Sequence, residues 1–204
     1  MNLISNNKKI FILILSFILA NFINHDILCA ATEKNIRNKK WATKMNIEGL
    51  DNLHKVSDNL YRSAQPTATG MRNAEKLGIG TIISLRSKQK DTPLIKGTNL
   101  KLIHVSMRAW NAKLEDAIFL MRTLNPNNPI FEGKPVLVHC YHGADRTGWI
   151  IALYRITYEN WNKKDAIEEM LKGGYGYHKS IWKDIVNFLE DINEEEFKEL
   201  VLKK

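Results

Sequence analysis

One cysteine and one arginine of this 204-residue chain have the types and the spacing for phosphoryl chemistry. Cys140 and Arg146 belong to the run HCYHGADRTG at residues 139–148. A thiolate is a strong nucleophile, and a guanidinium binds two phosphoryl oxygens in one planar fork, which a lysine cannot do. The run therefore predicts a phosphate-binding loop with the nucleophile Cys140 at its base and Arg146 as the clamp.

The neighbours of this pair supply the rest of the predicted loop. Gly143 permits a tight turn and the close approach of oxygens. We expect the substrate to contact the backbone N–H groups of the loop and side chains at its rim, which involves Tyr141, His142, Gly143, Ala144 and Thr147. The Thr147 hydroxyl can also donate to the cysteine sulfur, which eases departure of the thiolate when a phosphocysteine breaks down.

The flanking sequence places this loop between a strand and a helix. Residues 136–138 form a short apolar run of strand character, and residues 149–154 are typical of a largely buried helix. Backbone N–H groups at such a turn bind an anion, and the helix N-terminus adds partial positive charge. Both the helix N-terminus and Arg146 favour the thiolate form of the cysteine.

Strand and helix patterns alternate along the rest of the chain. We expect strands at residues 59–62, 81–85 and 100–105, and helices at residues 67–77, 114–124, 162–172, 179–189 and 194–202. This alternation predicts a single-domain α/β fold in which helices flank a central, mainly parallel sheet. In such folds a ligand binds at the carboxyl end of a strand, which is where the loop lies.

The loop resembles the signature of the cysteine-dependent protein tyrosine and dual-specificity phosphatases. Residues 59–66 (NLYRSAQP) and 77–86 (LGIGTIISLR) resemble the opening of the bacterial members, and residues 169–178 resemble their closing segment. The similarity covers residues 56–189 and is closest to the TpbA-like group of bacterial periplasmic tyrosine phosphatases. A bare Cys-x5-Arg pattern is weak, but the strand, the helix and the further segments in order make it specific.

This resemblance implies hydrolysis of phosphotyrosine, and also of phosphoserine or phosphothreonine in a dual-specificity enzyme, through a phosphocysteine intermediate. It implies no metal and no cofactor. The substrate is expected to be a phosphorylated protein, and the resemblance suggests a membrane-bound diguanylate cyclase as a partner. Two other functions stay open: an inositol-polyphosphate phosphatase and a phospho-binding module with little turnover. An inert buried cysteine, a rhodanese or an arsenate reductase agrees less well with DRTG at residues 145–148 and with the flanking segments.

The general acid is where this chain departs from the family pattern. Relatives protonate the leaving oxygen with an aspartate on a loop before the motif, and Asn111 stands at that place here. Asp145 is the first candidate to replace that aspartate, unless its carboxylate only orders the loop. Asp116 is the second candidate, although the first turn of a helix stabilises its anion and makes it a poorer acid. Acid catalysis could also be weak.

Four further residues near the motif have open roles. His139 either tunes the nucleophile through hydrogen bonds or is structural. Tyr61 and Arg62 either approach the site from the first strand or pack at its edge. His178 has no partner ligands at metal-site spacing, so the sequence predicts no metal site.

The N-terminus has the pattern of a secretory signal peptide. Lys8 and Lys9 precede an apolar run at residues 10–20 that is short for a membrane span, and small residues at 29–31 fit a cleavage site. We expect a signal peptide at residues 1–31, a lead-in segment at residues 32–55 and a phosphatase domain at residues 56–204. This predicts a periplasmic or secreted protein with no integral membrane domain after cleavage; an uncleaved anchor is the alternative.

The charge of the chain bears on its ligands, and its cysteine content agrees with export. The net charge of +8 suits phosphorylated or otherwise acidic ligands, and no interleaved aromatic and basic pattern points to nucleic acid. The two cysteines of the chain are Cys29 and Cys140. Cleavage of the signal peptide would therefore leave Cys140 without an intramolecular disulfide partner.

Overall fold

The computed structural model describes residues 37–88, 90–108, 112–178, 181 and 183–203. Residues Lys40–Lys204 form one compact unit. The predicted signal peptide and Asn111 lie outside the described residues. Within those ranges, every helix is too short or too polar to span a bilayer.

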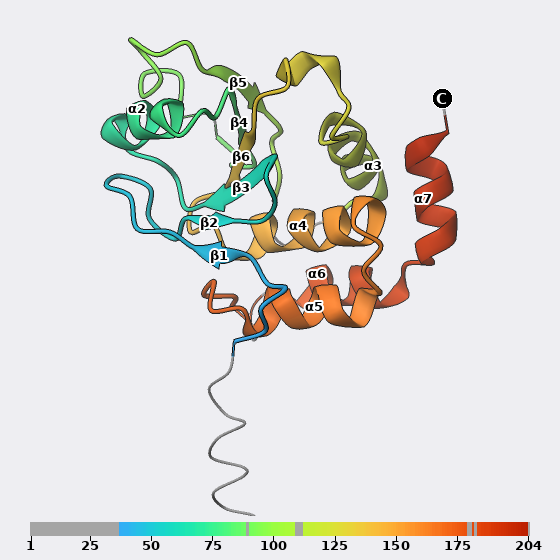
Figure 1. The fold of residues 1–204 in the computed structure, drawn as a ribbon. Coiled ribbons are helices and arrows are strands. Elements are labelled where there is room, and N and C mark those ends of the chain that lie inside the picture. Colours follow the sequence, from blue (N-terminus) through green and yellow to red (C-terminus); the bar gives the residue numbers. More distant parts are fainter. Residues whose placement is uncertain (1–36, 89, 109–111, 179–180, 182, 204) are drawn as a thin grey trace, which may run out of the picture. The chain divides into compact units, whose positions relative to one another are not determined.

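The described residues form a six-stranded sheet in the order β1-β2-β3-β6-β4-β5 (Figure 1). Its strands are β1 (Thr43–Lys44), β2 (His54–Lys55), β3 (Leu60–Ser63), β4 (Thr81–Ser84), β5 (Lys101–His104) and β6 (Val136–His139). The strands β3, β6, β4 and β5 pair in parallel, whereas β1 and β2 continue the sheet beyond β3 as antiparallel strands. These pairings confirm the predicted mainly parallel sheet.

The strands β1 and β2 lie in the part of the chain for which the sequence predicts a loose lead-in. Thr43 and Lys44 pair with β2, and β2 in turn pairs with β3. Ala42 and Leu53, next to these strands, are buried. Strands of two residues are too short to show a hydrophobic alternation, so sequence periodicity does not reveal them.

The central strand β6 is buried on both faces, which explains the apolar run at residues 136–138. Successive side chains point to opposite faces of a strand. Accordingly, Val136 and Val138 belong to the larger hydrophobic cluster with α4 (Asp145–Tyr158). Leu137 belongs to the smaller cluster with α2 (Ala68–Lys76) on the other face.

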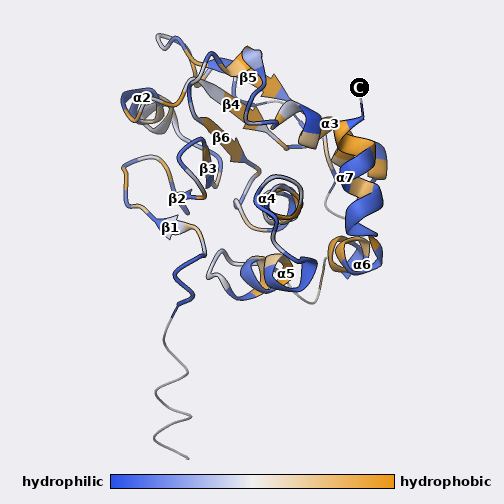
Figure 2. Cartoon of the chain, turned by 45° about the vertical axis from the view of Figure 1, so that its right-hand side comes forward, coloured by the Kyte–Doolittle hydropathy of each residue, from blue (hydrophilic) through white to orange (hydrophobic). Residues whose placement is uncertain are grey.

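Helices cover both faces of the sheet. Besides α2 and α4 they are α3 (Leu114–Thr123), the 3-10 helix η1 (Pro129–Phe131), α5 (Lys163–Lys172), α6 (Lys183–Asp191) and α7 (Glu194–Leu202). The helix α4 is buried along most of its length because α3, α5, α6 and α7 all pack against it. Figure 2 shows α4 nearly end-on between the sheet and α5.

The helix ends follow the capping signals in the sequence. Thr67 and Asn162 cap α2 and α5, because each side chain accepts a hydrogen bond from a backbone N–H of the first turn. The helix α7 spans the predicted residues 194–202. The helix α6 begins at Lys183, and the predicted start at residue 179 lies outside the described residues.

Candidate active site

Residues 140–144 connect the end of β6 to the start of α4. The neighbouring strands end level with this loop, since Ser63 of β3 and Ser84 of β4 are both in register with His139. The loop therefore lies at the carboxyl edge of the parallel strands, where ligands bind in such folds. Cys140 is a free thiol at the start of the loop and is 2% exposed.

Gly143 lets the loop pack directly against the end of β3. Its φ of +70° lies in the left-handed region. A Cβ at this position would lie 2.3 Å from the Ser63 carbonyl oxygen. Backbone strain and collision both disfavour a side chain here, so the glycine sets how closely the loop approaches β3.

Arg62 of β3 places a buried positive charge under the loop. Its Nη2 donates to the Gly143 carbonyl at 2.8 Å and to the Ala144 carbonyl at 3.5 Å. The guanidinium also lies 3.6 Å from the centre of the Tyr175 ring. Burial lowers the pKa of Arg62, while the charge on Cys140 is one of the groups that raise it. Arg62 is therefore placed to attract a negative charge on the Cys140 sulfur.

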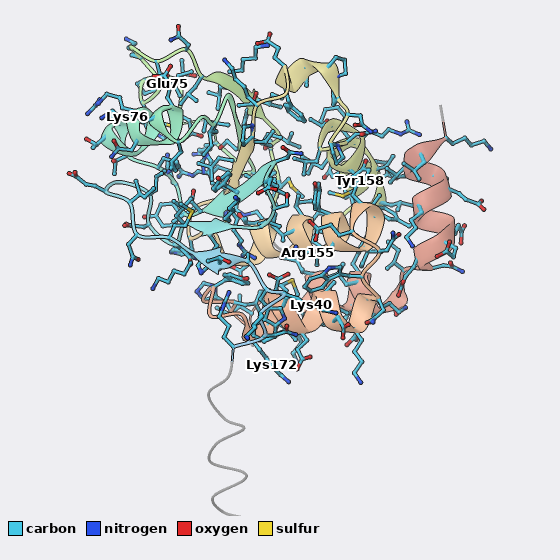
Figure 3. All side chains as sticks on the ribbon, in the orientation of Figure 1. Lys40, Glu75, Lys76, Arg155, Tyr158 and Lys172 are labelled. Carbon is cyan, nitrogen blue, oxygen red and sulfur yellow. The ribbon has the colours of Figure 1, made fainter. Side chains whose placement is uncertain are left out.

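A buried ion pair between Arg155 of α4 and Glu169 of α5 supports Tyr175. Arg155 donates to the two oxygens of Glu169 at 2.8 and 3.1 Å. Glu169 Oε1 also accepts from the Tyr175 hydroxyl at 2.8 Å and from the Ala42 N–H at 2.7 Å. Burial raises the pKa of Glu169, but the hydrogen bonds from Arg155 outweigh it and hold the pKa below its ordinary value. Arg155 further donates to the Lys40 carbonyl at 3.4 Å, and Figure 3 labels both residues.

Arg146 is fixed between two backbone carbonyls. Its Nη1 donates to the Leu85 carbonyl at 3.1 Å and to the Met107 carbonyl at 3.2 Å. Leu85 directly follows β4, and Met107 lies beyond β5, so the arginine is held from two parts of the chain. In the described part of the chain these bonds use one nitrogen of the guanidinium, which leaves the other donors for phosphoryl oxygens.

A cavity of about 400 Å³ borders the loop. It is lined by Arg86, Ser87, Tyr141, His142, Asp145, Arg146, His178 and Ile181. Its volume is within the range of small-molecule sites. The structure thus brings the predicted residues Tyr141, His142, Asp145 and Arg146 together around one space. Gly143 and Ala144 form the turn of the loop itself.

Thr147 does not make the hydrogen bond that the sequence predicts for it. Its side chain is fully buried in α4. Its Oγ1 has no hydrogen-bond partner among the described residues, so in this structure it does not donate to the sulfur of Cys140. A substrate-binding role for Thr147 stays a prediction.

Asp145 is held by His178, a residue whose role the sequence leaves open. Asp145 Oδ1 accepts from the His178 backbone N–H at 2.9 Å, and the ring Nδ1 lies 2.9 Å from Oδ2. Because Asp145 begins α4, these bonds attach the segment after α5 to the end of the loop. Asp116 lies in the first turn of α3 and is absent from the described lining of the cavity.

A buried histidine–aspartate pair lies behind the nucleophile. The His139 ring Nδ1 lies 3.0 Å from the Cys140 carbonyl oxygen, and its Nε2 lies 3.5 Å from Asp91 Oδ2. Gln65 Nε2 donates to Asp91 Oδ1 at 2.9 Å, and Arg86 donates to Gln65 Oε1. Burial raises the pKa of Asp91, but the polar groups around it, led by His139, lower the pKa to about 2. The network joins the nucleophile to the cavity wall at Arg86.

Sequence reasoning misses Asp91 and Gln65 as parts of the site. Gln65 belongs to the NLYRSAQP segment, so the family resemblance is a signal that could have identified it. Asp91 stands in a polar loop without periodicity, where no local pattern marks it. Tyr61 belongs to the smaller hydrophobic cluster, the one with α2, and this supports a packing role for Tyr61.

Comparisons with known proteins agree with this site. A family model described as "Tyrosine phosphatase family" matches residues 49–204. The dual specificity protein phosphatase TpbA of Pseudomonas aeruginosa is 32% identical over 164 residues, which cover 80% of this chain and 72% of that protein.

Solved structures show the same fold. The crystal structure of a cysteine-to-serine variant of P. aeruginosa TpbA in complex with phosphotyrosine has a TM-score of 0.74 at 26% identity, and the match covers 83% of this chain and 100% of that one. The core catalytic domain of the S. cerevisiae PP-IP phosphatase Siw14 has a TM-score of 0.62 at 23% identity, over 78% of this chain and 95% of that one. The second likeness supports the fold alone. With a family model matching most of the chain and TpbA at this identity, the chain belongs to the tyrosine phosphatase family and is a protein-tyrosine or dual-specificity phosphatase.

Proposed function

We propose that this enzyme hydrolyses phosphotyrosine in a protein substrate through a phosphocysteine intermediate. The observation that carries the proposal is a free thiol, Cys140, at the start of a loop whose Arg146 is fixed beside a cavity of about 400 Å³. A nucleophile, a phosphate-binding fork and room for a substrate are the parts that this reaction needs.

The proposed chemistry has two steps. The Cys140 thiolate attacks phosphorus, so that an S–P bond forms and the bond from phosphorus to the leaving oxygen breaks. Arg146 and the loop N–H groups hold the phosphoryl oxygens while their charge changes in the transition state. A water then attacks the phosphocysteine, which releases phosphate and restores the thiolate. The proposed steps use no metal and no cofactor.

The leaving group favours phosphotyrosine over phosphoserine and phosphothreonine. A tyrosine phenol has a pKa of about 10 and departs more easily without a proton than an alkoxide does. Tyr141 and Arg86 line the cavity, with the guanidinium 5.1 Å from the centre of the Tyr141 ring, and they offer flat surfaces to an aromatic substrate. The TpbA variant in complex with phosphotyrosine supports the same substrate class.

A panel of phosphopeptides and inositol polyphosphates, with turnover and binding both measured, tests this function. We expect Cys140→Ser to abolish turnover and to keep phosphopeptide binding, because Arg146 and the loop remain. We expect Arg146→Lys to lose both, since a point charge replaces the planar fork. EDTA should leave the wild-type rate unchanged, and hydrolysis by Cys140→Ser would reject the thiolate mechanism.

The same panel separates the two alternatives. Faster turnover of inositol polyphosphates than of phosphotyrosine peptides would favour the inositol-polyphosphate phosphatase. Tight binding of phosphopeptides with negligible turnover by the wild type would favour the phospho-binding module.

The location and the partner belong to the same proposal. The signal-peptide pattern at residues 1–31 supports a periplasmic or secreted enzyme, and resemblance to the TpbA-like group supports a membrane-bound diguanylate cyclase as its substrate. N-terminal sequencing of the protein from the periplasmic fraction should find a start near residue 31 or 32. Met1 on a membrane-bound form would support an uncleaved anchor instead. Loss of the enzyme should raise tyrosine phosphorylation of the periplasmic part of the cyclase.

A further inference from the structure

His178 and Asp145 form a pair at the wall of the cavity that the two proposed steps do not use. The ring Nδ1 of His178 lies 2.9 Å from Asp145 Oδ2 and 3.1 Å from Oδ1. The His178 side chain is 39% exposed, whereas that of Asp145 is 8% exposed. The carboxylate is therefore buried behind the ring, and the ring is the accessible member of the pair.

We infer that His178 is the proton donor for the leaving oxygen, with Asp145 as the residue that positions it. The inference rests on the proposed phosphatase function. It answers a need of this chain, because the loop position at which relatives carry an aspartate is Asn111, and an amide does not donate that proton.

The hydrogen bonds decide between the two members of the pair. Asp145 Oδ1 accepts from the His178 backbone N–H at 2.9 Å, and the ring Nδ1 lies within 3.1 Å of both carboxylate oxygens. Both oxygens of Asp145 are thus engaged by His178 and the side chain is buried, so Asp145 is not the member of the pair that reaches a leaving oxygen. The imidazole has a second nitrogen, Nε2, which the described residues leave without a hydrogen bond. An acceptor on Nδ1 fixes the tautomer and leaves Nε2 as the atom that gives and takes the proton.

The position of His178 fits proton transfer to the leaving oxygen of a bound substrate. Its ring centre lies 5.4 Å from that of His142, which belongs to the loop and lines the same cavity. Asp145 is the direct neighbour of Arg146, so the pair and the phosphate clamp start from one turn of α4. Figure 1 shows residues 173–178, which follow α5, at the same end of the helical layer as the start of α4.

The proton balance closes over the two steps. When the Sγ–P bond forms and the P–O bond breaks, the electron pair goes to the leaving oxygen, which takes the proton from Nε2 of the imidazolium. The neutral imidazole then takes a proton from the water that attacks the phosphocysteine. As the P–Sγ bond breaks, sulfur leaves as a thiolate and His178 is again an imidazolium. One side chain thus serves as acid and then as base, and no further reactant is needed.

A series of aryl phosphates with different leaving groups tests the inference. For His178→Gln we expect kcat/KM on phenyl phosphate to fall by on the order of 10²–10³. The rate on 2,4-dinitrophenyl phosphate should stay near that of the wild type, because its leaving group needs no proton. The latter rate also shows that the variant is folded and that Cys140 and Arg146 still act. The dependence of kcat/KM on the leaving-group pKa should therefore steepen.

Two further variants make the assignment specific. Asp145→Asn should steepen the same dependence to a smaller extent, since the ring stays but its orientation is lost. His104→Gln is the control, a part-buried histidine of β5 that is absent from the described lining of the cavity, and should keep the wild-type dependence. An unchanged dependence in His178→Gln would overturn the inference, as would a change confined to His104→Gln or to Asp145→Asn. A wild type without turnover on any aryl phosphate would instead reject the proposed function.

Discussion

Arg62 and Asp91 are buried charged residues that touch no substrate in the proposed mechanism, yet both act on the loop that carries Cys140. Arg62 binds the loop carbonyls from below, and Asp91 reaches the Cys140 backbone through His139. Burying a charge is costly unless it is paired and hydrogen-bonded. At the residue scale, the same two buried charges therefore hold the loop in place and determine the electrostatic potential around Cys140.

Replacement of Arg62 by methionine tests its action on the thiol. We expect Arg62→Met to lower the free energy of unfolding by about 1–3 kcal/mol, because the Gly143 carbonyl loses its buried donor. Alkylation of Cys140 by iodoacetamide at neutral pH should become slower, because the buried positive charge that attracts the sulfur anion is removed. Arg72→Met is the control, because that arginine bonds Thr69 on the surface of α2. An unchanged alkylation rate in folded Arg62→Met would contradict this account.

The lowered pKa of Asp91 predicts that the stability of the protein depends on pH. Its pKa of about 2 lies below its ordinary value, so the folded protein binds this proton less readily than the unfolded chain. Asp91 therefore contributes stability that is present above about pH 4 and is lost as the pH falls toward 2, an effect of about 2 kcal/mol.

Asp91→Asn should remove this contribution. We expect a loss of about 2 kcal/mol at neutral pH and a smaller difference from the wild type near pH 3, measured by urea unfolding at both values. The control Asp58→Asn removes a carboxylate from an exposed pair with Lys55 and should change stability little. A deficit in Asp91→Asn that stays the same at both pH values would show that the shifted ionisation is not its cause.

At the element scale, the connection from β6 to α4 depends on Gly143, because no residue with a side chain fits at this position. Gly143 has a left-handed φ, and a Cβ there would collide with the end of β3. We expect Gly143→Ala to push the loop away from β3 and to lower kcat/KM on phosphotyrosine peptides by at least about 10²-fold, since a misplacement of about 1 Å costs that much.

Gly133 offers a matched control for the backbone strain. Its φ is +69°, close to that of Gly143, but a Cβ there would meet nothing within 4 Å. Gly133→Ala should therefore cost only the strain, about 1 kcal/mol, and should leave the rate unchanged. Equal losses of activity in the two variants would show that strain, and not the contact with β3, explains the effect.

Elements with strong local signals could be predicted from the sequence, and the others could not. Local signals mark the strands β4 and β6, which are apolar runs, and the starts of α2 and α5, which are the caps Thr67 and Asn162. Each signal spans only a few residues, so it locates its element accurately in the sequence. The strands β1 and β2 have two residues each and form only because β3 is present to pair with them. Their existence is a property of the assembled sheet.

At the scale of the whole molecule the same distinction holds for the site. Cys140 and Arg146 stand in one local motif, so the sequence reveals them and the loop they form. The contacts that support the loop join distant parts of the chain, such as Asp91 with His139 and Arg62 with Gly143. The pairing of Asp145 with His178 is of the same kind. Such partners depend on how the sheet and helices pack, which a single sequence does not specify.

The N-terminal limit of the folded unit gives the last prediction. The compact unit begins at Lys40, and the Ala42 N–H donates to the buried Glu169, whereas the sequence places the start of the phosphatase domain at residue 56. A chain of residues 40–204 should keep the unfolding free energy and turnover of a chain that starts at residue 32. A chain of residues 56–204 lacks β1, β2 and the donor to Glu169, so it should lose several kcal/mol, because a buried charge loses a hydrogen bond and buried apolar contacts are removed. Urea unfolding and phosphopeptide turnover should be measured for the chains that start at residues 32, 40 and 56. Equal stability of the chains that start at residues 40 and 56 would place the boundary of the domain at residue 56.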